Sequence, residues 1–340
     1  MKVTMEDVAK AAGVSKTTVS RIINGNYQYV TEDTKLKVLK IIKELDYRPN
    51  AIAKGLKQMK TNVIGIVLSN LQNPFWSSVL DGVEDRCQSL NYNLMICNSK
   101  EDAKLEAEHI KGLRVRQVDG LIMNPTMKNE ELYKEIAENN DPFVSINRKI
   151  PGLNIKTITI NNVQGAKLAV DHLLKIGRNK IAILVYPYNN ISPRLERIEG
   201  YKKAIKNFHE PVEYSYVHEI EETKGVAKEQ VKKLLKEDMA PNAILSTNNM
   251  MTLEILEGIK ESGLKVPDDI SVIGYDETVW SMHLNPPLTT VSQPAYEMGG
   301  LAAEQLIDLI ENKKHNQANT VELEPKLIKR VSCGHASEKL

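Results

Sequence analysis

The chain has 340 residues, of which 41% are hydrophobic and 26% are charged. This length is too great for one ordinary domain, so we expect two or three domains with a sizeable core. No apolar run approaches the about 18–20 residues of a membrane span, and the first residues, MKVTMEDVAK, lack the apolar stretch of a signal peptide. Three cysteines without a CxxC pair and seven scattered histidines predict reduced thiols in a cytoplasmic protein, without a zinc site.

The net charge of +1 hides an asymmetry along the chain. Residues 1–60 carry twelve Lys and Arg against six Asp and Glu, whereas the remaining 280 residues carry 33 against 38. A basic N-terminal segment followed by a mildly acidic remainder is typical of a protein whose N-terminal segment binds a polyanion. Charge alone leaves a solvated basic face as the alternative.

The stretch EDVAKAAGVSKTTVSRIING, at 6–25, predicts two short helices joined by a tight turn. Gly13 suits the left-handed end of the first helix, and Ser15 suits the N-cap of the second. The inner faces of the two helices would hold Val8, Ala9, Ala12, Val19, Ile22 and Ile23. The small Ala9 at the crossing indicates a helix-turn-helix, whose second helix enters the DNA major groove. A plain helical hairpin with a polar outer face is the alternative.

A third helix follows the loop NGNYQYV, with Thr31 as its N-cap. Its apolar positions are Leu36, Val38, Leu39, Ile42 and Leu45. Three small helices in about 45 residues predict a DNA-reading headpiece. The next segment, Asn50–Lys57, is too short to be a stable helix alone, so we expect it to order only against a partner. A flexible basic linker is the alternative there.

From Thr61 onward, short apolar strands alternate with amphipathic helices. This alternation predicts parallel sheets covered by helices on both faces, and about 270 residues suffice for two such lobes. Ligands of open parallel sheets bind beyond the carboxyl ends of the strands, so the candidate site is a cleft between lobes. The chain has no G-x-G-x-x-G, G-x-x-x-x-G-K-[ST] or G-x-S-x-G motif, which disfavours an enzyme. The alternative is a sugar-binding protein or an α/β enzyme without a DNA role.

Several motifs follow one another in a characteristic order along residues 3–333. They are VTMEDVAKAAGVSKTTVSRIING, VTEDTKLKVLKIIKELDYRPNAIAKGL, IGIVLSNLQNPFW, VDGLIMNP, RLERIEGY, ISVIGYDE and PPLTTVSQPAYEMG. This succession resembles the LacI/GalR family of transcription regulators. The resemblance implies a helix-turn-helix headpiece at 1–48, a hinge helix and linker at 49–60, an effector-binding and dimerisation core at 61–333 and a tail at 334–340.

The implied core is similar to a periplasmic sugar-binding protein, with two doubly wound parallel-sheet lobes. Lobe one would span about 61–161 and 292–322, and lobe two about 162–291 and 323–333, so that the chain crosses between them near 161, 291 and 322.

On the outer side of the second helix stand short or cationic groups suited to phosphates and base edges. The resemblance extends the expected DNA contacts to both ends of the headpiece and to the hinge. The full set is Thr4, Met5, Ser15, Lys16, Thr17, Thr18, Ser20, Arg21, Asn24, Thr31, Thr34, Tyr47, Asn50, Ala53, Lys54 and Leu56. Leu56 matches the family's hinge leucine, which is wedged between base steps in the minor groove.

The resemblance also places an effector site on strand ends and the loops after them. The expected residues are Phe75, Trp76, Asn124, Asn147, Arg148, Asn161, Arg194, Arg197, Asn248 and Asp276. Phe75 and Trp76 would present flat faces to a sugar ring, with burial in the core as the alternative. Arg197 matches the family's effector-binding arginine, and a surface arginine is its alternative. Asp276 would accept hydrogen bonds from ligand hydroxyls, or else cap a helix.

The chain departs from the family at three positions that usually hold aspartate. They are Asn147, Asn161 and Asn249. Fewer negative charges beside three arginines predict an anionic effector, with a sugar acid ahead of a sugar phosphate. The sequence TNNMM at 247–251 is also similar to regulators of sugar-acid catabolism, such as those for keto-deoxygluconate. If Arg148 and Arg194 only pair with acidic neighbours, the cleft would suit a neutral sugar instead.

We therefore expect a repressor of a carbohydrate catabolic operon that binds double-stranded operator DNA as a homodimer. A dimer presents two recognition helices to the halves of a pseudo-palindromic operator. A small sugar or sugar-acid effector would change the angle between the lobes and hence the spacing of the hinges. The end of the chain, CGHASEKL, has no heptad repeat for tetramer formation. No catalytic residue, metal, cofactor or membrane contact is expected.

Overall fold

The computed structural model describes residues 3–47, 60–208, 214–312 and 319–334. The chain divides into two compact units, Met1–Asn62 and Val63–Leu340. The expected hinge at 49–60 and tail at 334–340 lie outside the described residues, apart from Lys60 and Gly334. No helix in the described ranges is long and apolar enough to cross a membrane.

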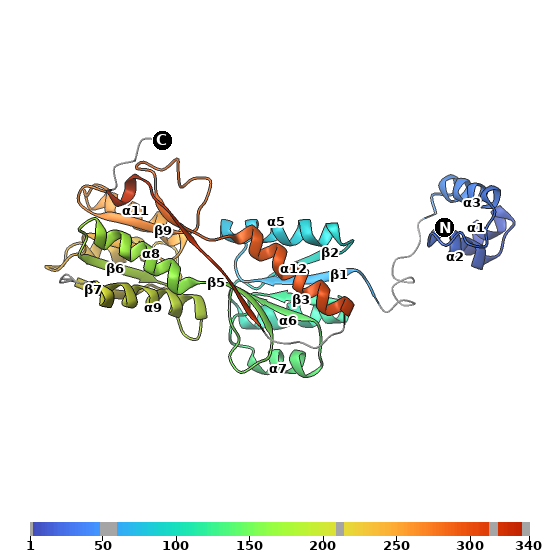
Figure 1. Ribbon diagram of the computed structural model, residues 1–340, viewed down its shortest axis with the longest axis horizontal. Helices are drawn as coiled ribbons and strands as arrows, with labels where there is room; N and C mark the ends of the chain where they lie inside the picture. The colour runs from blue at the N-terminus through green and yellow to red at the C-terminus, as the bar shows by residue number, and fades with distance from the viewer. Residues whose placement is uncertain (1–2, 48–59, 209–213, 313–318, 335–340) are drawn as a thin grey trace. The chain divides into compact units, whose positions relative to one another are not determined.

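The first unit holds the three predicted helices (Figure 1). They are α1 (Met5–Ala12), α2 (Lys16–Ile23) and α3 (Glu32–Glu44). The side chains of Thr4, Ser15 and Thr31 cap them, because each accepts a hydrogen bond from a backbone N–H in the first turn. Gly13 ends α1 in the left-handed conformation, with φ at 67°. These local signals confirm the helix-turn-helix.

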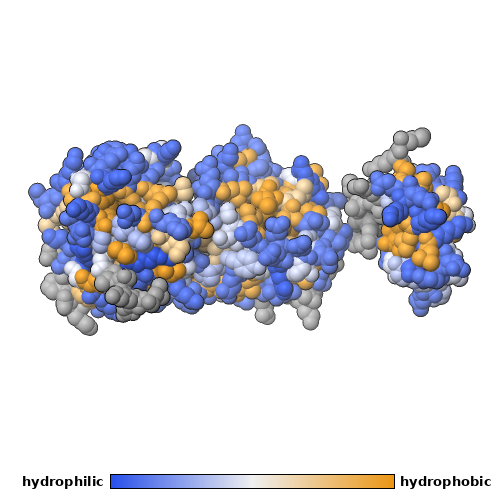
Figure 2. Space-filling view, turned by 90° about the horizontal axis from the view of Figure 1, so that it is seen from above, coloured by the Kyte–Doolittle hydropathy of each residue, from blue (hydrophilic) through white to orange (hydrophobic). Residues whose placement is uncertain are grey.

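The core of this unit includes only part of the apolar positions expected in α3. Val8, Ala12, Val19, Ile22 and Val38 are buried together with Tyr47. The buried stripe of α3 runs through Val38, Ile41 and Ile42, at spacings of three and four residues. Leu36, Leu39 and Leu45 lie beside that stripe and are exposed, so three of the five apolar positions expected in this helix lie outside the core. Hydrophobic residues accordingly show at the surface of this unit (Figure 2).

The second unit contains two six-stranded sheets, described here as lobe one and lobe two. In lobe one the strand order is β11-β5-β4-β3-β1-β2, and all neighbouring strands run parallel. The strands are β1 (Val63–Leu68), β2 (Asn93–Asn98), β3 (Gly120–Met123), β4 (Phe143–Ile146), β5 (Lys156–Ile160) and β11 (Thr320–Leu323). Its helices are α5 (Pro74–Ser89), α6 (Ala103–Val115), α7 (Glu130–Glu138) and α12 (Ala295–Asn312).

In lobe two the order is β12-β10-β9-β8-β6-β7, parallel except where β12 runs antiparallel to β10. The strands are β6 (Lys180–Val185), β7 (Tyr214–Glu219), β8 (Ala243–Ser246), β9 (Ser271–Tyr275), β10 (Thr289–Ser292) and β12 (Lys326–Ile328). The helices are α8 (Asn162–Lys175), α9 (Ser192–Asn207), α10 (Val226–Leu234) and α11 (Asn249–Glu261), followed by the short 3-10 helix η1 (Val331–Cys333). Helices cover both faces of each sheet, which confirms the predicted fold class (Figure 1).

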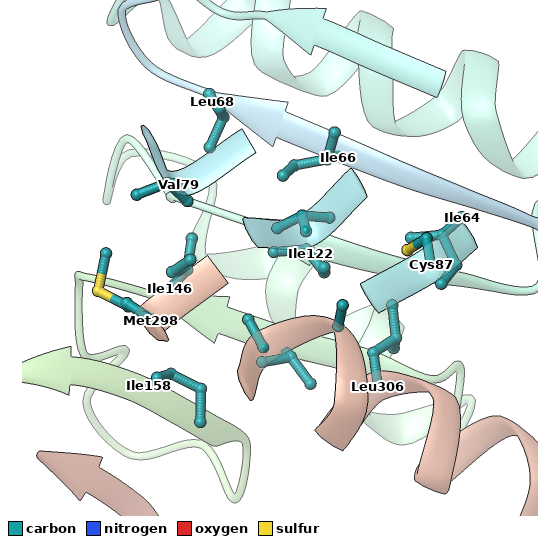
Figure 3. Close-up of a cluster of buried hydrophobic side chains, with 14 of the residues drawn as sticks. Ile64, Ile66, Leu68, Val79, Cys87, Ile122, Ile146, Ile158, Met298 and Leu306 are labelled. Carbon is teal, nitrogen blue, oxygen red and sulfur yellow. The ribbon is translucent and has the colours of Figure 1, made fainter. Parts of the chain in front are cut away.

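The main core of lobe one lies between its sheet and the pair α5 and α12 (Figure 3). The strands contribute Ile64, Ile66, Leu68, Ile122, Ile146 and Ile158, and the helices Val79, Cys87, Met298 and Leu306. The two helices touch through glycines, because a Cβ added to Gly82 would lie 2.0 Å from the carbonyl oxygen of Tyr296. This close contact packs the middle of α5 against the first turn of α12.

Within the described residues, the chain passes between the two lobes three times (Figure 1). The passages run from β5 to α8, from β10 to α12 and from β11 to β12. Loops that follow the carboxyl ends of strands in both sheets meet between the lobes, as the residues lining the cavity there show.

Candidate functional site

A polar cavity lies between the lobes, beyond the carboxyl ends of the strands. Its lining comprises Ser69, Asn70, Asn73, Phe75, Trp76, Glu101, Asn147 and Arg148 from lobe one, with Ile191, Pro193, Arg194, Arg197, Glu222, Asn248, Asp276 and Gln293 from lobe two or the passage that follows β10. Eight of the ten expected effector residues are in this set. Ligands occupy this position in open parallel sheets generally, so the cavity is the candidate site.

The other two expected residues, Asn124 and Asn161, do not line the cavity. Asn124 is fully buried and its Nδ2 donates to Ser69 Oγ at 2.6 Å. Asn161 caps α8, since its Oδ1 accepts from the backbone N–H of Gln164 at 3.0 Å, and its Nδ2 donates to Glu324 Oε1 at 3.0 Å. Both therefore support neighbouring structure.

Phe75 and Trp76 belong to the core and border the cavity at the same time. They are 8% and 4% exposed and pack edge to face, with ring centroids 5.0 Å apart. Asn73 caps α5 just before them by accepting from the backbone N–H of Phe75 at 2.8 Å. The rings are held rigidly, and only their margins are available to a ligand.

Two of the three cavity arginines are paired with glutamates that sequence reasoning missed. Arg148 makes a two-pronged pair with Glu101 at 2.5 and 3.0 Å, within lobe one. Arg194 donates to Glu222 at 2.8 Å, within lobe two. Burial alone would raise the pKa of Glu101, but the charge and hydrogen bonds of Arg148 outweigh it and the pKa is lowered. Glu101 follows β2 and Glu222 follows β7, so an acidic residue just after a strand was the available signal.

Arg197 is the cavity arginine whose hydrogen bonds go to neutral groups. Its guanidinium donates to Asn162 Oδ1 at 3.0 Å, to the carbonyl oxygen of Thr247 at 2.6 Å and to Gln293 Oε1 at 3.3 Å. It also lies over the ring of Tyr275, with Cζ 4.0 Å from the centroid. The carboxylates within the described ranges form no direct ion pair with it.

Asp276 lies beside Arg197 in a water-poor position. It is 6% exposed, and it accepts hydrogen bonds from Gln293 and from Asn249 Nδ2, the latter at 3.0 Å. Burial raises its pKa, although the charge of Arg197 and the bond from Gln293 partly offset that effect. Asp276 and Asn147 both have φ at 67°, a left-handed backbone that turns their side chains at the strand ends.

Asn248 and Asn249 have separate roles at the start of α11. Asn248 lines the cavity and caps the helix by accepting from the backbone N–H of Met250 at 2.9 Å. Asn249 is fully buried and joins the lobes, because its Nδ2 donates to Asn73 Oδ1 at 2.8 Å as well as to Asp276. Two buried atoms here have no partner among the described residues, Asn249 Oδ1 and Arg148 Nε.

A series of polar contacts connects the cavity with an ion pair between lobe one and α9. Lys149 Nζ donates to Glu196 Oε1 at 2.6 Å and to Glu322 Oε1 at 2.8 Å, which joins lobe one to α9. Glu196 Oε2 accepts from Asn162 Nδ2 at 3.1 Å, and Asn162 Oδ1 accepts from Arg197. These contacts link Arg197 to an ion pair between the lobes.

The expected DNA contacts of the headpiece are mostly exposed. Thr4, Ser15, Lys16, Thr17, Arg21, Asn24 and Thr31 are exposed, and Met5, Thr18, Ser20 and Thr34 are partly buried. Tyr47 is only 8% exposed and packs in the core, which argues against a direct DNA contact by its ring. Lys16 pairs with Glu6 at 2.9 Å. Asn50, Ala53, Lys54 and Leu56 lie outside the described residues.

Comparisons with known proteins agree with this geometry. The pattern of "Bacterial regulatory proteins, lacI family" matches residues 4–50, and that of "Periplasmic binding protein-like domain" matches residues 170–333. The HTH-type transcriptional regulator KdgR of Bacillus subtilis is 36% identical over 333 residues, 97% of each chain. Catabolite control protein A of Priestia megaterium is 35% identical over 324 residues, 95% of this chain and 97% of its own.

A solved structure extends the likeness to three dimensions. The lac repressor dimer bound to operator and the anti-inducer ONPF has a TM-score of 0.87 and 28% sequence identity, covering 98% of this chain and 99% of its own. A capped helix-turn-helix, two parallel-sheet lobes around a polar cavity and similarity over almost the whole length confirm the resemblance, including its KdgR-type subgroup. The chain belongs to the lacI family of DNA-binding transcriptional regulators.

Proposed function

We infer that this chain represses a carbohydrate catabolic operon, and that a small sugar-like effector in the cavity controls its binding to operator DNA. The observation that carries this inference is the origin of the cavity residues, which come from strand ends in both lobes. A ligand held there contacts both lobes at once and stabilises one angle between them. The change that the ligand causes in the free energy of DNA binding equals the difference between its binding free energies for the two arrangements of the lobes.

The contacts from Arg197 to Lys149 support this coupling. Arg197 reaches into the cavity, and its neighbour Asn162 holds Glu196 in the ion pair with Lys149. Because Asn162 is fully buried, losing Arg197 would leave its Oδ1 without a hydrogen bond, whereas its Nδ2 donates both to Glu196 and to the carbonyl oxygen of Ile160. Occupation of the cavity thus alters a junction between the lobes through direct contacts.

A homodimer is supported by apolar side chains exposed on the core unit. Met95 and Ile96 lie exposed on β2, the edge strand of lobe one. Val279 and Met282, in the loop after β9, are 86% and 57% exposed. Exposed apolar patches mark interaction surfaces, and a second copy of the chain would cover them. The similar lac repressor structure is itself a dimer bound to operator.

The favoured effector is a sugar acid whose carboxylate binds Arg197. This guanidinium is partly buried and bonded only to neutral acceptors, so a ligand carboxylate would form the direct ion pair that it lacks among the described residues. Ligand hydroxyls would bond to Asn147, Asn248 and Asp276. The three arginines supply less free positive charge than the sequence implied, since Glu101 and Glu222 neutralise two of them.

A neutral sugar is the second candidate, and those ion pairs favour it. Three arginines face Glu101, Glu222 and Asp276, so the cavity is balanced in formal charge. A neutral ligand would leave both ion pairs intact. The two candidates differ in their dependence on Arg197, because only the acid has a charge to place against it.

Calorimetry with the full-length protein separates these candidates. The ligands are 2-keto-3-deoxygluconate, D-gluconate and D-glucose, titrated into wild type, Arg197→Gln and the matched control Arg116→Gln, whose arginine is exposed and away from the cavity. The sugar-acid proposal expects an acid to bind wild type and the control, with about tenfold or greater loss in Arg197→Gln. Tighter binding of D-glucose, unaffected at Arg197, would favour the neutral candidate. Release of selected operator DNA by the bound ligand tests the regulatory role.

A further inference from the structure

The loop between α2 and α3 folds back along the exposed side of α2. Gly25 is left-handed with φ at 72°, and the backbone N–H of Asn26 donates to the carbonyl oxygen of Arg21 at 2.9 Å. The N–H of Val30 donates to the carbonyl oxygen of Tyr27 at 3.0 Å, which closes a turn. As a result the ring of Tyr29 lies beside the last turn of α2, and the Cζ atom of Arg21 is 5.6 Å from its centroid.

Tyr29 has no evident structural reason to be aromatic. This residue is 76% exposed, more than the other aromatic residues whose exposure the structure describes, and it is not part of the headpiece core. Tyr27, in the same loop, differs because Lys35 lies over its ring at 4.6 Å and is itself paired with Glu32. Tyr27 is therefore tied to α3, whereas the ring contact of Tyr29 is with an expected DNA-contacting residue.

The contact with Tyr29 orients Arg21 without occupying its donors. The attraction between a cation and a ring needs no hydrogen-bond acceptor, so the N–H groups of the Arg21 guanidinium stay available to DNA. No carboxylate in the described headpiece forms an ion pair with Arg21. Recognition of a guanine needs two N–H groups in one plane aimed at O6 and N7. A ring that fixes this plane reduces the conformational freedom lost on binding.

We propose that Tyr29 is a positioning residue for Arg21, and that the base preference read by Arg21 depends on the Tyr29 ring. The contact is weak in water and strengthens when DNA excludes solvent from it. This inference goes beyond the proposed effector response and rests only on DNA binding by the headpiece. It assigns a determinant of base preference to the loop between Asn24 and Thr31, in which the sequence predicted no DNA contact.

Affinity selection from a random DNA library tests the proposal and requires no known operator sequence. The full-length proteins are wild type, Arg21→Ala, Tyr29→Ala, Tyr29→Phe, the double variant at 21 and 29, and the matched loop control Tyr27→Ala. We expect Tyr29→Ala to bind the sequence selected by wild type about 5- to 30-fold more weakly. Its preference should flatten at the same base position in each half-site as in Arg21→Ala. Tyr29→Phe, which keeps the ring, should restore that preference.

The double variant and the control decide the mechanism. If Tyr29 acts through Arg21, the double variant binds no more weakly than Arg21→Ala alone. Additive losses, uniform weakening at all positions, or an unchanged preference in Tyr29→Ala would each overturn the proposal. Equal flattening by Tyr27→Ala would also overturn it, because the loop rather than the Tyr29 ring would then be responsible. If wild type selects no motif, the failure belongs to sequence-specific DNA binding and not to Tyr29. Thermal unfolding of each variant checks that the headpiece stays folded.

Discussion

Alanine substitutions at two adjacent glycines in α12 are expected to change the stability of the chain in opposite directions. A Cβ on Gly299 would lie 2.0 Å from the carbonyl oxygen of Val79 in α5, whereas a Cβ on Gly300 would meet nothing closer than 3.5 Å. Real Cβ atoms stay beyond 3.0 Å, so Gly299→Ala would force the helices apart by about 1 Å. Overpacking of this kind costs about 1–3 kcal/mol, and backbone atoms cannot relieve it by changing rotamer. Gly300→Ala should instead stabilise by about 0.5–1 kcal/mol, because alanine loses less entropy in a helix.

Urea unfolding of the full-length chain measures both effects. Trp76, near the start of α5, reports on lobe one once Trp280→Phe has removed the other tryptophan. We expect the midpoint to fall in Gly299→Ala and to rise in Gly300→Ala. Equal midpoints in the two variants would refute the close helix contact. Loss of stability in both variants would show that glycine is required at these positions for its backbone flexibility and not for close packing of the helices.

Three further outcomes follow from the structure and the sequence. Arg21→Ala should weaken binding to selected DNA and make that binding less dependent on salt, because an exposed cation at the end of α2 is lost. A salt titration measures both effects, and an unchanged salt slope would exclude a phosphate contact. Leu56→Ala should reduce DNA bending and specific affinity in a gel-shift assay while effector binding stays nearly intact, and normal bending would contradict the wedge prediction. Asp276→Asn should change the pH dependence of stability, because burial raises the pKa of Asp276, and the stability this carboxyl group contributes is present below its unfolded pKa and lost as pH rises through the folded pKa. The urea midpoint of the variant relative to wild type should therefore rise as pH increases above the ordinary range of a carboxylate, and it would not change with pH if the carboxylate were well solvated.

The fold was predictable because its signals are local. The caps at Thr4, Ser15 and Thr31 and the stop at Gly13 need only neighbouring residues, and the alternation of strands and helices needs only periodicity. The inner face of α3 was harder, since leucines at 36 and 39 compete with Val38 for the same helical stripe. Which face is buried depends on where α1 and α2 lie, and the sequence of α3 does not contain that information.

The site was predicted less completely because its charges pair across strands. Glu101 and Arg148 are 47 residues apart, and they meet because the loops after β2 and β4 turn toward the same sheet edge. No local pattern assigns that partner. Strand ends could be identified from sequence, so most lining residues were found, but the electrostatic balance of the cavity required the strand order.

The three asparagines that replace the family's usual aspartates have different explanations. Asn249 donates to Asp276, which can only accept, and to Asn73 Oδ1, which already accepts from the N–H of Phe75. An aspartate at 249 would set two carboxylates 3.0 Å apart in a buried site. An aspartate at 161 would likewise face Glu324, to which the amide now donates. Only Asn147 borders the cavity with a side chain that no neighbouring group in the described ranges requires. The case for an anionic effector therefore rests on Arg197 and Asn147, the two positions at which ligand charge should be tested first.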